Sequence, residues 1–110
     1  MFKSLTALLF LASPVLAQTN SAINCYQGGL VAIESEHLAT IHFTNNSEHS
    51  VDILWLNYEG EEIYYHTLPP EESYEQASYF SHPWVVYRAG SNVCKGIVVP
   101  FTSRVEFSVN

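Results

Sequence analysis

The stretch that decides the fold runs from Trp55 to Trp84 and reads WLNYEGEEIYYHTLPPEESYEQASYFSHPW. It contains both tryptophans of the chain and most of its tyrosines. Ser78 and His82 lie four residues apart near its end, among these aromatic residues. Aromatic walls with a few placed polar groups are typical of small selective binding pockets. The stretch therefore predicts such a pocket, formed where a strand-rich fold brings these residues together.

Turn-forming residues recur every eight to twelve residues along the chain, within this stretch and on both sides of it. No helical periodicity of useful length interrupts them, which is typical of an all-β sandwich or barrel. We predict a single small all-β domain of about seven short antiparallel strands, and the turn pattern leaves both a sandwich and a barrel open. The expected strands cover residues 38–43, 51–57, 61–67, 73–79, 84–87, 96–99 and 104–109, with a further short strand at 30–33.

The strand expected at 51–57 is apolar on both of its faces, because its hydrophobic residues occupy alternate and adjacent positions alike. Side chains alternate between the two faces of a strand, so this one is expected in the centre of its sheet. The neighbouring strands each have one more polar face. A groove lined by Tyr65, Ser78 and Trp84 is therefore expected beside it.

The first residues have the composition of a secretory signal peptide. Lys3 is followed by an apolar run at 5–12, by Pro14, and by small residues that end at Ala17. A membrane span needs about 20 apolar residues, and this run is shorter. We predict that residues 1–17 are a signal peptide and that the protein is secreted and extracellular.

The remaining 93 residues are enough for one domain. We expect an N-terminal segment at 18–37, tethered by Cys25, and a β domain at 38–110. Cys25 and Cys94 are the only cysteines, and in an oxidising compartment they are expected to form a disulfide. The loop between them is long, so the bond should contribute roughly 4 kcal/mol to stability. Asn45 begins the sequence Asn-Asn-Ser, a predicted glycosylation site.

The charge balance is acidic. Without residues 1–17 the chain has three basic residues against eleven carboxylates, which leaves a net charge of −8. Nucleic acid and anionic membranes are therefore disfavoured as partners, and a neutral or basic partner fits better. An acidic surface that only keeps a secreted protein soluble would have the same sign.

Four short motifs along the chain carry a family resemblance. They read FTNNS at 43–47, WLNYEG at 55–60, YHTLPP at 65–70, and SY followed by HPW at 78–84. In residue identity and spacing they resemble the β domain of the von Hippel–Lindau tumour suppressor family, over about residues 38–107. The resemblance implies that domain's β-sandwich fold.

The resemblance also implies a function, because that family recognises 4-hydroxyproline in an extended peptide. The family's pocket consists of two tryptophans, a tyrosine, a serine and a histidine, which fall here on Trp55, Tyr65, Ser78, His82 and Trp84. The aromatic rings would enclose the pyrrolidine ring, and Ser78 and His82 would bond its hydroxyl. An unhydroxylated proline would leave those two groups unpaired, at roughly 1–3 kcal/mol each.

The chain also departs from the family. It has the predicted signal peptide, and it ends at Asn110, so the helical domain that recruits elongin C is expected to be absent. We therefore expect no ubiquitin-ligase recruitment. Its surroundings are also more acidic than the family's, at Glu34, Glu36, Glu71, Glu72 and Glu75.

Two other functions remain open on sequence grounds. The aromatic residues of a secreted structural or inhibitory β-sandwich would all be core. A small hydrolase would pair Ser78 with His82 and a glutamate, although no nucleophile motif is present. A metal cluster among His37, His42, His49 and His66 has little support from their spacing. We expect a non-enzymatic, monomeric binding protein with no cofactor and no metal.

Overall fold

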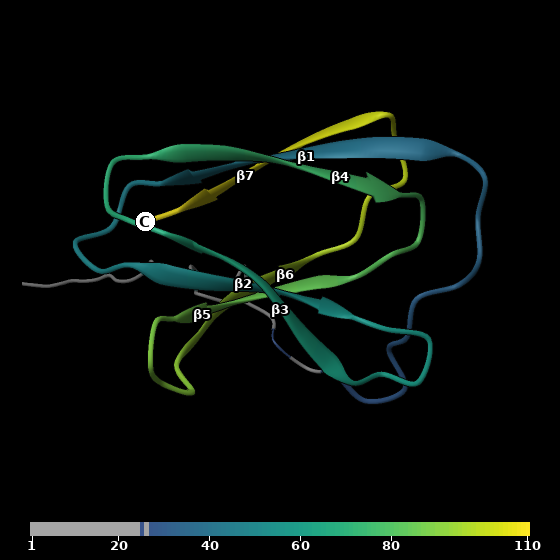
Figure 1. Ribbon diagram of the computed structural model, residues 1–110, viewed down its shortest axis with the longest axis horizontal. Coiled ribbons are helices and arrows are strands. Elements are labelled where there is room, and N and C mark those ends of the chain that lie inside the picture. The colour runs from purple at the N-terminus through teal and green to yellow at the C-terminus, as the bar shows by residue number, and fades with distance from the viewer. Residues whose placement is uncertain (1–24, 26) are drawn as a thin grey trace, which may run out of the picture.

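The computed structural model describes residues 25 and 27–110, and it is built from β-strands (Figure 1). The strands are β1 (Leu38–Asn45), β2 (Val51–Leu56), β3 (Glu62–Leu68), β4 (Ser73–Tyr79), β5 (Trp84–Arg88), β6 (Cys94–Val98) and β7 (Arg104–Val109). The all-β prediction is confirmed. The described part has no helix with the length and apolarity needed to cross a membrane. The predicted signal peptide lies outside the described residues.

The strands form two sheets that lie face to face as the two layers of a sandwich (Figure 1). One has the order β4-β1-β7 and the other β3-β2-β5-β6, so β2 is central, as predicted. The pairs are antiparallel except for β1 and β7, which are parallel, with Ile41 opposite Val105. The expectation of purely antiparallel strands is wrong here. The reason is that the chain crosses from one sheet to the other between β6 and β7. No hairpin therefore fixes the direction of β7 relative to β1.

The hydrophobic core fills the space between the two sheets. Ile41 and Phe43 of β1 are fully buried, at alternate positions along the strand. Phe43 packs edge-to-face on Phe107 of β7, with ring centroids 5.8 Å apart. Gly96 of β6 lies directly beneath that second ring, because a Cβ there would be 2.7 Å from the Phe107 ring. The core thus closes the edge of the sandwich formed by β6 and β7.

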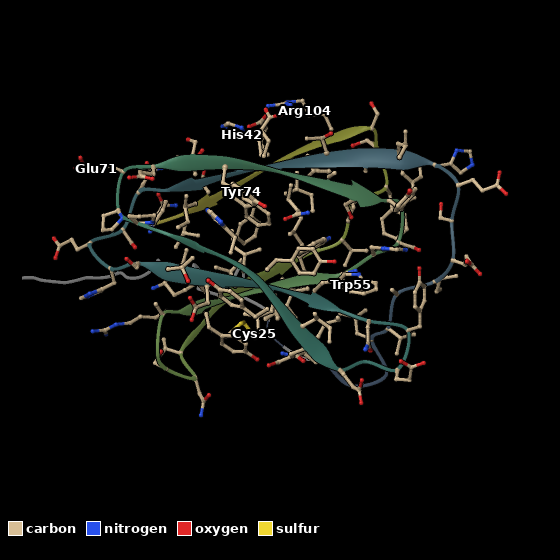
Figure 2. All side chains as sticks on the ribbon, viewed as in Figure 1. Cys25, His42, Trp55, Glu71, Tyr74 and Arg104 are labelled. Carbon is tan, nitrogen blue, oxygen red and sulfur yellow. A yellow bond between two sulfur atoms is a disulfide. The ribbon has the colours of Figure 1, made fainter. Side chains whose placement is uncertain are left out.

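A β-bulge interrupts the pairing of β2 with β3. Ile53 pairs with His66 and Leu54 pairs with Tyr64, so Tyr65 is an extra residue on β3. Bulges break the alternation of side chains and redirect them. Tyr65 and His66 are adjacent, yet both face the opposite sheet, where His66 stacks on Tyr74 of β4 with centroids 3.8 Å apart. Figure 2 shows Tyr74 between the two layers.

The segment at 27–37 contains no strand, so the strand expected at 30–33 is wrong. Its backbone hydrogen bonds are made to loops instead, and a loop offers no strand with which this segment could pair. Ala32 N–H donates to the Asn57 carbonyl (3.1 Å), and the His37 carbonyl accepts from Phe80 N–H (2.9 Å). The predicted disulfide between Cys25 and Cys94 is present and ties the start of the segment to β6.

The glycosylation prediction at Asn45 does not fit this fold. The Asn45 side chain is fully buried, and its amide nitrogen donates to the carbonyls of His49 and Leu68, both at 2.9 Å. Its oxygen accepts from the Ser47 backbone and hydroxyl. The nitrogen that would carry a sugar has neither exposure nor a spare bond. The motif instead forms the turn after β1.

Candidate ligand-binding pocket

A pocket of about 190 Å³ opens between the two sheets, on the side where β3 and β4 form the edges. Its walls come from β2, β3, β4, β5 and the two loops that follow β2 and β4. The lining residues are Trp55, Tyr58, Tyr65, Ala77, Ser78, Tyr79, His82 and Trp84. All five residues predicted for the site from the sequence are among them. The fold therefore brings together side chains that lie up to 29 residues apart in the chain.

The turn between β4 and β5 returns His82 to the pocket. Ser81 has a positive φ of 69°, a conformation that costs free energy in a residue other than glycine. Two bonds hold it there: Ser81 N–H donates to the Pro100 carbonyl, and its hydroxyl donates to the Ile33 carbonyl, each at 2.9 Å. This reversal places His82 on the same pocket wall as Ser78.

The aromatic walls meet at steep angles, which leaves a slot between them. Tyr65 lies 4.9 Å from Trp84 and 6.4 Å from Trp55 between ring centroids, both edge-to-face. Trp55 stacks on His82 at 5.6 Å. Trp84 is only 2% exposed, whereas Tyr65 is 46% exposed. The slot thus has a buried back wall and an open rim.

The polar groups of the pocket are only partly satisfied within the protein. Trp84 Nε1–H donates to Ser78 Oγ at 2.9 Å, and Ser78 Oγ has a long contact of 3.4 Å to the Tyr79 carbonyl. His82 Nε2 and Trp55 Nε1 are buried and have no partner in the described chain. Buried polar atoms in native proteins are nearly always paired, and each exception calls for an explanation. Here both belong to residues that line one pocket, where a bound polar ligand would supply the missing bonds.

His82 is poised as a neutral imidazole. Burial lowers the pKa of His82 below its ordinary value, and a backbone hydrogen bond to Ile33 and the charge of Glu34 oppose that shift only in part. A neutral ring offers one nitrogen as an acceptor and the other as a donor. The His82 ring can therefore both donate and accept a hydrogen bond near pH 7.

Three lining residues were not among the sequence predictions, and two of them are tyrosines. Tyr58 packs edge-to-face on Trp55 and on His82, with centroids 5.5 and 5.6 Å apart. Tyr79 lies 5.5 Å from His82. Tyr58 stands in a turn, where strand alternation gives no direction for a side chain. Its place within the motif that begins at Trp55 was the one available signal.

The geometry does not support a hydrolase. The hydroxyl of Ser78 receives the Trp84 indole N–H, and Nε2 of His82 has no partner in the described chain. A serine nucleophile needs an adjacent base within hydrogen-bond reach. The described residues also contain no group of three or more histidine, cysteine or acidic side chains placed to hold a metal ion. The residues that line the pocket offer a ligand aromatic surfaces and hydrogen-bonding groups.

The fold and the pocket together define the class as a small β-sandwich domain with an aromatic slot at the seam of its two sheets. The comparison with protein families supplies the particular one. A family model described as the VHL beta domain matches residues 30–99, which is more than half of the chain and includes all five predicted pocket residues. The chain belongs to the VHL beta domain family, and the resemblance seen in the sequence is confirmed. In the von Hippel–Lindau protein this domain recognises hydroxyproline-containing substrates and is not catalytic.

Proposed function

We propose that this protein is a secreted binding module that recognises 4-hydroxyproline in extended polypeptides and carries out no chemistry on them. One observation carries the proposal. His82 Nε2 is buried and has no hydrogen-bond partner in residues 25 and 27–110, and it shares with Ser78 a slot of single-residue size between aromatic rings. A flat apolar ring would fill this slot, and a hydroxyl group on that ring would supply the missing hydrogen bond to His82 Nε2.

The proposed recognition depends on a directed chain of hydrogen bonds. Trp84 Nε1–H donates to Ser78 Oγ, which leaves the Ser78 proton free to point into the slot, since its contact to the Tyr79 carbonyl is long. Ser78 then donates to the ligand hydroxyl oxygen, and the ligand hydroxyl donates to His82 Nε2. Each group in such a chain polarises the next, which strengthens the whole in a water-poor site.

Discrimination against unmodified proline follows from the same bonds. Proline fills the slot but leaves Ser78 and His82 without partners, at roughly 1–3 kcal/mol for each group. Since about 1.4 kcal/mol corresponds to a factor of ten, the expected preference for the hydroxylated residue is about a hundredfold or more.

The polypeptide that carries the residue is expected to be extended. The pocket opens between β3 and β4, which are both edge strands and so have unpaired backbone groups along one side. An extended segment can pair with such an edge while one side chain enters the pocket. Tyr65 is 46% exposed at the rim, and its hydroxyl would donate to a ligand carbonyl.

Two further parts of the proposal concern the cellular setting. The disulfide between Cys25 and Cys94 suits an oxidising compartment, which supports secretion. The second part, recognition without ubiquitin-ligase recruitment, stays a prediction.

The test is binding of the secreted protein to matched peptides that differ only in the 4-hydroxyl of one proline, measured by calorimetry. We expect tight binding of the hydroxylated form alone. Equal affinity for both peptides would overturn the proposal and favour the alternative of a structural β-sandwich. That alternative has one supporting observation, which is that Trp84 also belongs to the buried core.

A further inference from the structure

A second groove, of about 500 Å³, adjoins the proposed hydroxyproline pocket. Its lining residues are Glu34, Ser35, Glu36, Leu38, Tyr58 and Tyr79. Tyr58 and Tyr79 line both hollows, so a polypeptide that leaves the pocket on this side passes directly into the groove. We name this hollow the flank groove.

The wall of the flank groove is held at both of its ends. Just before Glu34, the Ile33 carbonyl accepts the Ser81 hydroxyl, and just after Glu36, the His37 carbonyl accepts Phe80 N–H, each at 2.9 Å. Both partners belong to the turn that also carries His82. The wall and the pocket therefore rest on the same turn and keep a fixed relation to each other.

The carboxylates of this wall are not neutralised within the described chain. The ion pairs of the described residues lie elsewhere, on the outer face of the three-stranded sheet (Figure 2). They join His42 and Arg104 to Glu75, and Arg104 to Glu106. Glu34 and Glu36 are exposed and take part in none of them. The charge of Glu34 also reaches His82, whose pKa it acts to raise. The negative field thus extends from the groove to the pocket.

Apart from Ser35, the remaining residues of the groove have large apolar surfaces and are exposed. Leu38 is 69%, Tyr58 47% and Tyr79 40% exposed. A long basic side chain matches this combination, because its methylene stem covers apolar surface while its charged end reaches a carboxylate. The tyrosine rings add a favourable surface for a cation.

We propose that the flank groove binds a lysine or arginine close in sequence to the hydroxyproline, so that the protein selects basic hydroxyproline-containing polypeptides. This inference rests on the proposed function and narrows its ligand class. It also rests on His82 in the adjoining pocket, which is only 6% exposed and whose Nε2 has no hydrogen-bond partner among the described residues. That atom gives the polypeptide its anchor beside the groove.

The other glutamates near β4 do not serve this role. Glu71 lies at the opposite end of the sandwich from Trp55 (Figure 2), in the turn between β3 and β4. Glu75 is paired with Arg104 at 2.8 Å. Glu71 and Glu72 therefore provide a matched control, since their removal changes the net charge by the same amount as removal of Glu34 and Glu36.

The experiment uses hydroxyproline peptides that carry lysine, glutamine or glutamate at each of the four positions before and after the hydroxyproline. At one or two positions, lysine peptides should bind roughly three- to tenfold more tightly than glutamine peptides at low salt, and glutamate peptides more weakly. The lysine advantage should disappear in E34Q/E36Q and persist in E71Q/E72Q. In E34K/E36K it should reverse in favour of glutamate.

The two proposals fail in different measurements. A lysine advantage that is the same in E34Q/E36Q and the wild type, or that E71Q/E72Q removes equally, would overturn the flank groove. The ratio of affinities for neutral hydroxyproline and proline peptides should be unchanged in E34Q/E36Q. A ratio near one in the wild type would overturn the hydroxyproline pocket, and the lysine advantage would still be readable with the proline peptides.

Discussion

The indole N–H of Trp84 donates to the hydroxyl of Ser78 at 2.9 Å, and this bond joins the two sheets of the sandwich. Trp84 belongs to β5 and Ser78 to β4, so the bond crosses the seam at the back of the pocket. Both side chains are buried. One contact thus contributes to the stability of the sandwich and orients the hydroxyl that faces the proposed ligand.

Replacing Trp84 with phenylalanine tests this double role. Trp84→Phe keeps an aromatic wall but removes the donor, so we expect the free energy of unfolding to fall by about 1–3 kcal/mol. The preference for hydroxyproline over proline should shrink as well, because Ser78 loses the bond that fixes its proton. Chemical denaturation and peptide calorimetry measure the two effects. A variant with unaltered preference would show that the indole N–H does not orient Ser78.

Replacing His82 with alanine tests the acceptor. We expect His82→Ala to lower the affinity for the hydroxylated peptide about tenfold or more, with little change for the proline peptide, since only the hydroxyl uses Nε2. His49→Ala is the matched control, because the His49 side chain is exposed and does not line the pocket. An equal loss of affinity for both peptides would mean that His82 acts only by shaping the wall.

The pH dependence should follow His82. Its pKa in the folded protein is lowered, chiefly by burial, so the unfolded chain takes up the proton first as the pH falls. The stability contributed by neutral His82 is therefore fully present above its unfolded pKa and is lost as the pH falls through the lower folded pKa. Protonation also removes the acceptor at Nε2.

We accordingly expect the ratio of affinities for hydroxyproline and proline peptides to be constant in neutral and weakly alkaline solution. The ratio should then fall in the acid range, below the ordinary pKa of histidine. Calorimetry across that range, with His82→Ala as the pH-independent reference, checks the expectation. A ratio that increases on acidification would contradict a neutral acceptor.

Removal of the disulfide should lower the free energy of unfolding strongly and weaken the binding of lysine in the flank groove. The two cysteines are 69 residues apart, so the loop-entropy model predicts that C25S/C94S loses roughly 4 kcal/mol of unfolding free energy. The lysine advantage should weaken in the variant, because the segment that carries Glu34 is released at its start. The preference for hydroxyproline should survive wherever the variant remains folded. The reduced wild type should behave in the same way.

Asn45 should prove to be structural. Asn45→Ala removes the side-chain donor from the buried Leu68 carbonyl, at roughly 1–3 kcal/mol, and one of the two donors to the His49 carbonyl. The same burial predicts that protein secreted by a glycosylating host carries no sugar at this position, which intact-mass measurement checks. A glycan on the folded protein would require a different turn after β1.

The regular parts of the fold were predictable from the sequence, and the irregular parts were not. The strand Val51–Leu56 follows from its β-branched and aromatic content, and its central position follows from apolar residues on both faces. Alternation places Tyr65 and His66 on opposite faces, whereas the bulge turns both toward the other sheet. A bulge depends on the packing of two sheets, and no local pattern encodes it.

The pocket shows the same division. The five predicted residues meet in the structure, but periodicity alone predicted only a groove beside β2, and the full set came from the family resemblance. The flank groove was out of reach, because it needs the segment at 34–36 to be held by Phe80 and Ser81. Those bonds join loops, for which the sequence gives no register.

The anchoring of that segment also has a consequence for engineering. Its fixed points are carbonyl groups of Ile33 and His37, which any residue would supply, while the exposed side chains of Glu34 and Glu36 carry no part of the sandwich. The identity of these two positions can therefore be varied with little effect on folding. A library of variants at 34 and 36 would leave the proposed hydroxyproline pocket constant while changing which flanking sequences the proposed flank groove accepts. Such variants would sort hydroxylated proteins by the charge near the modified residue.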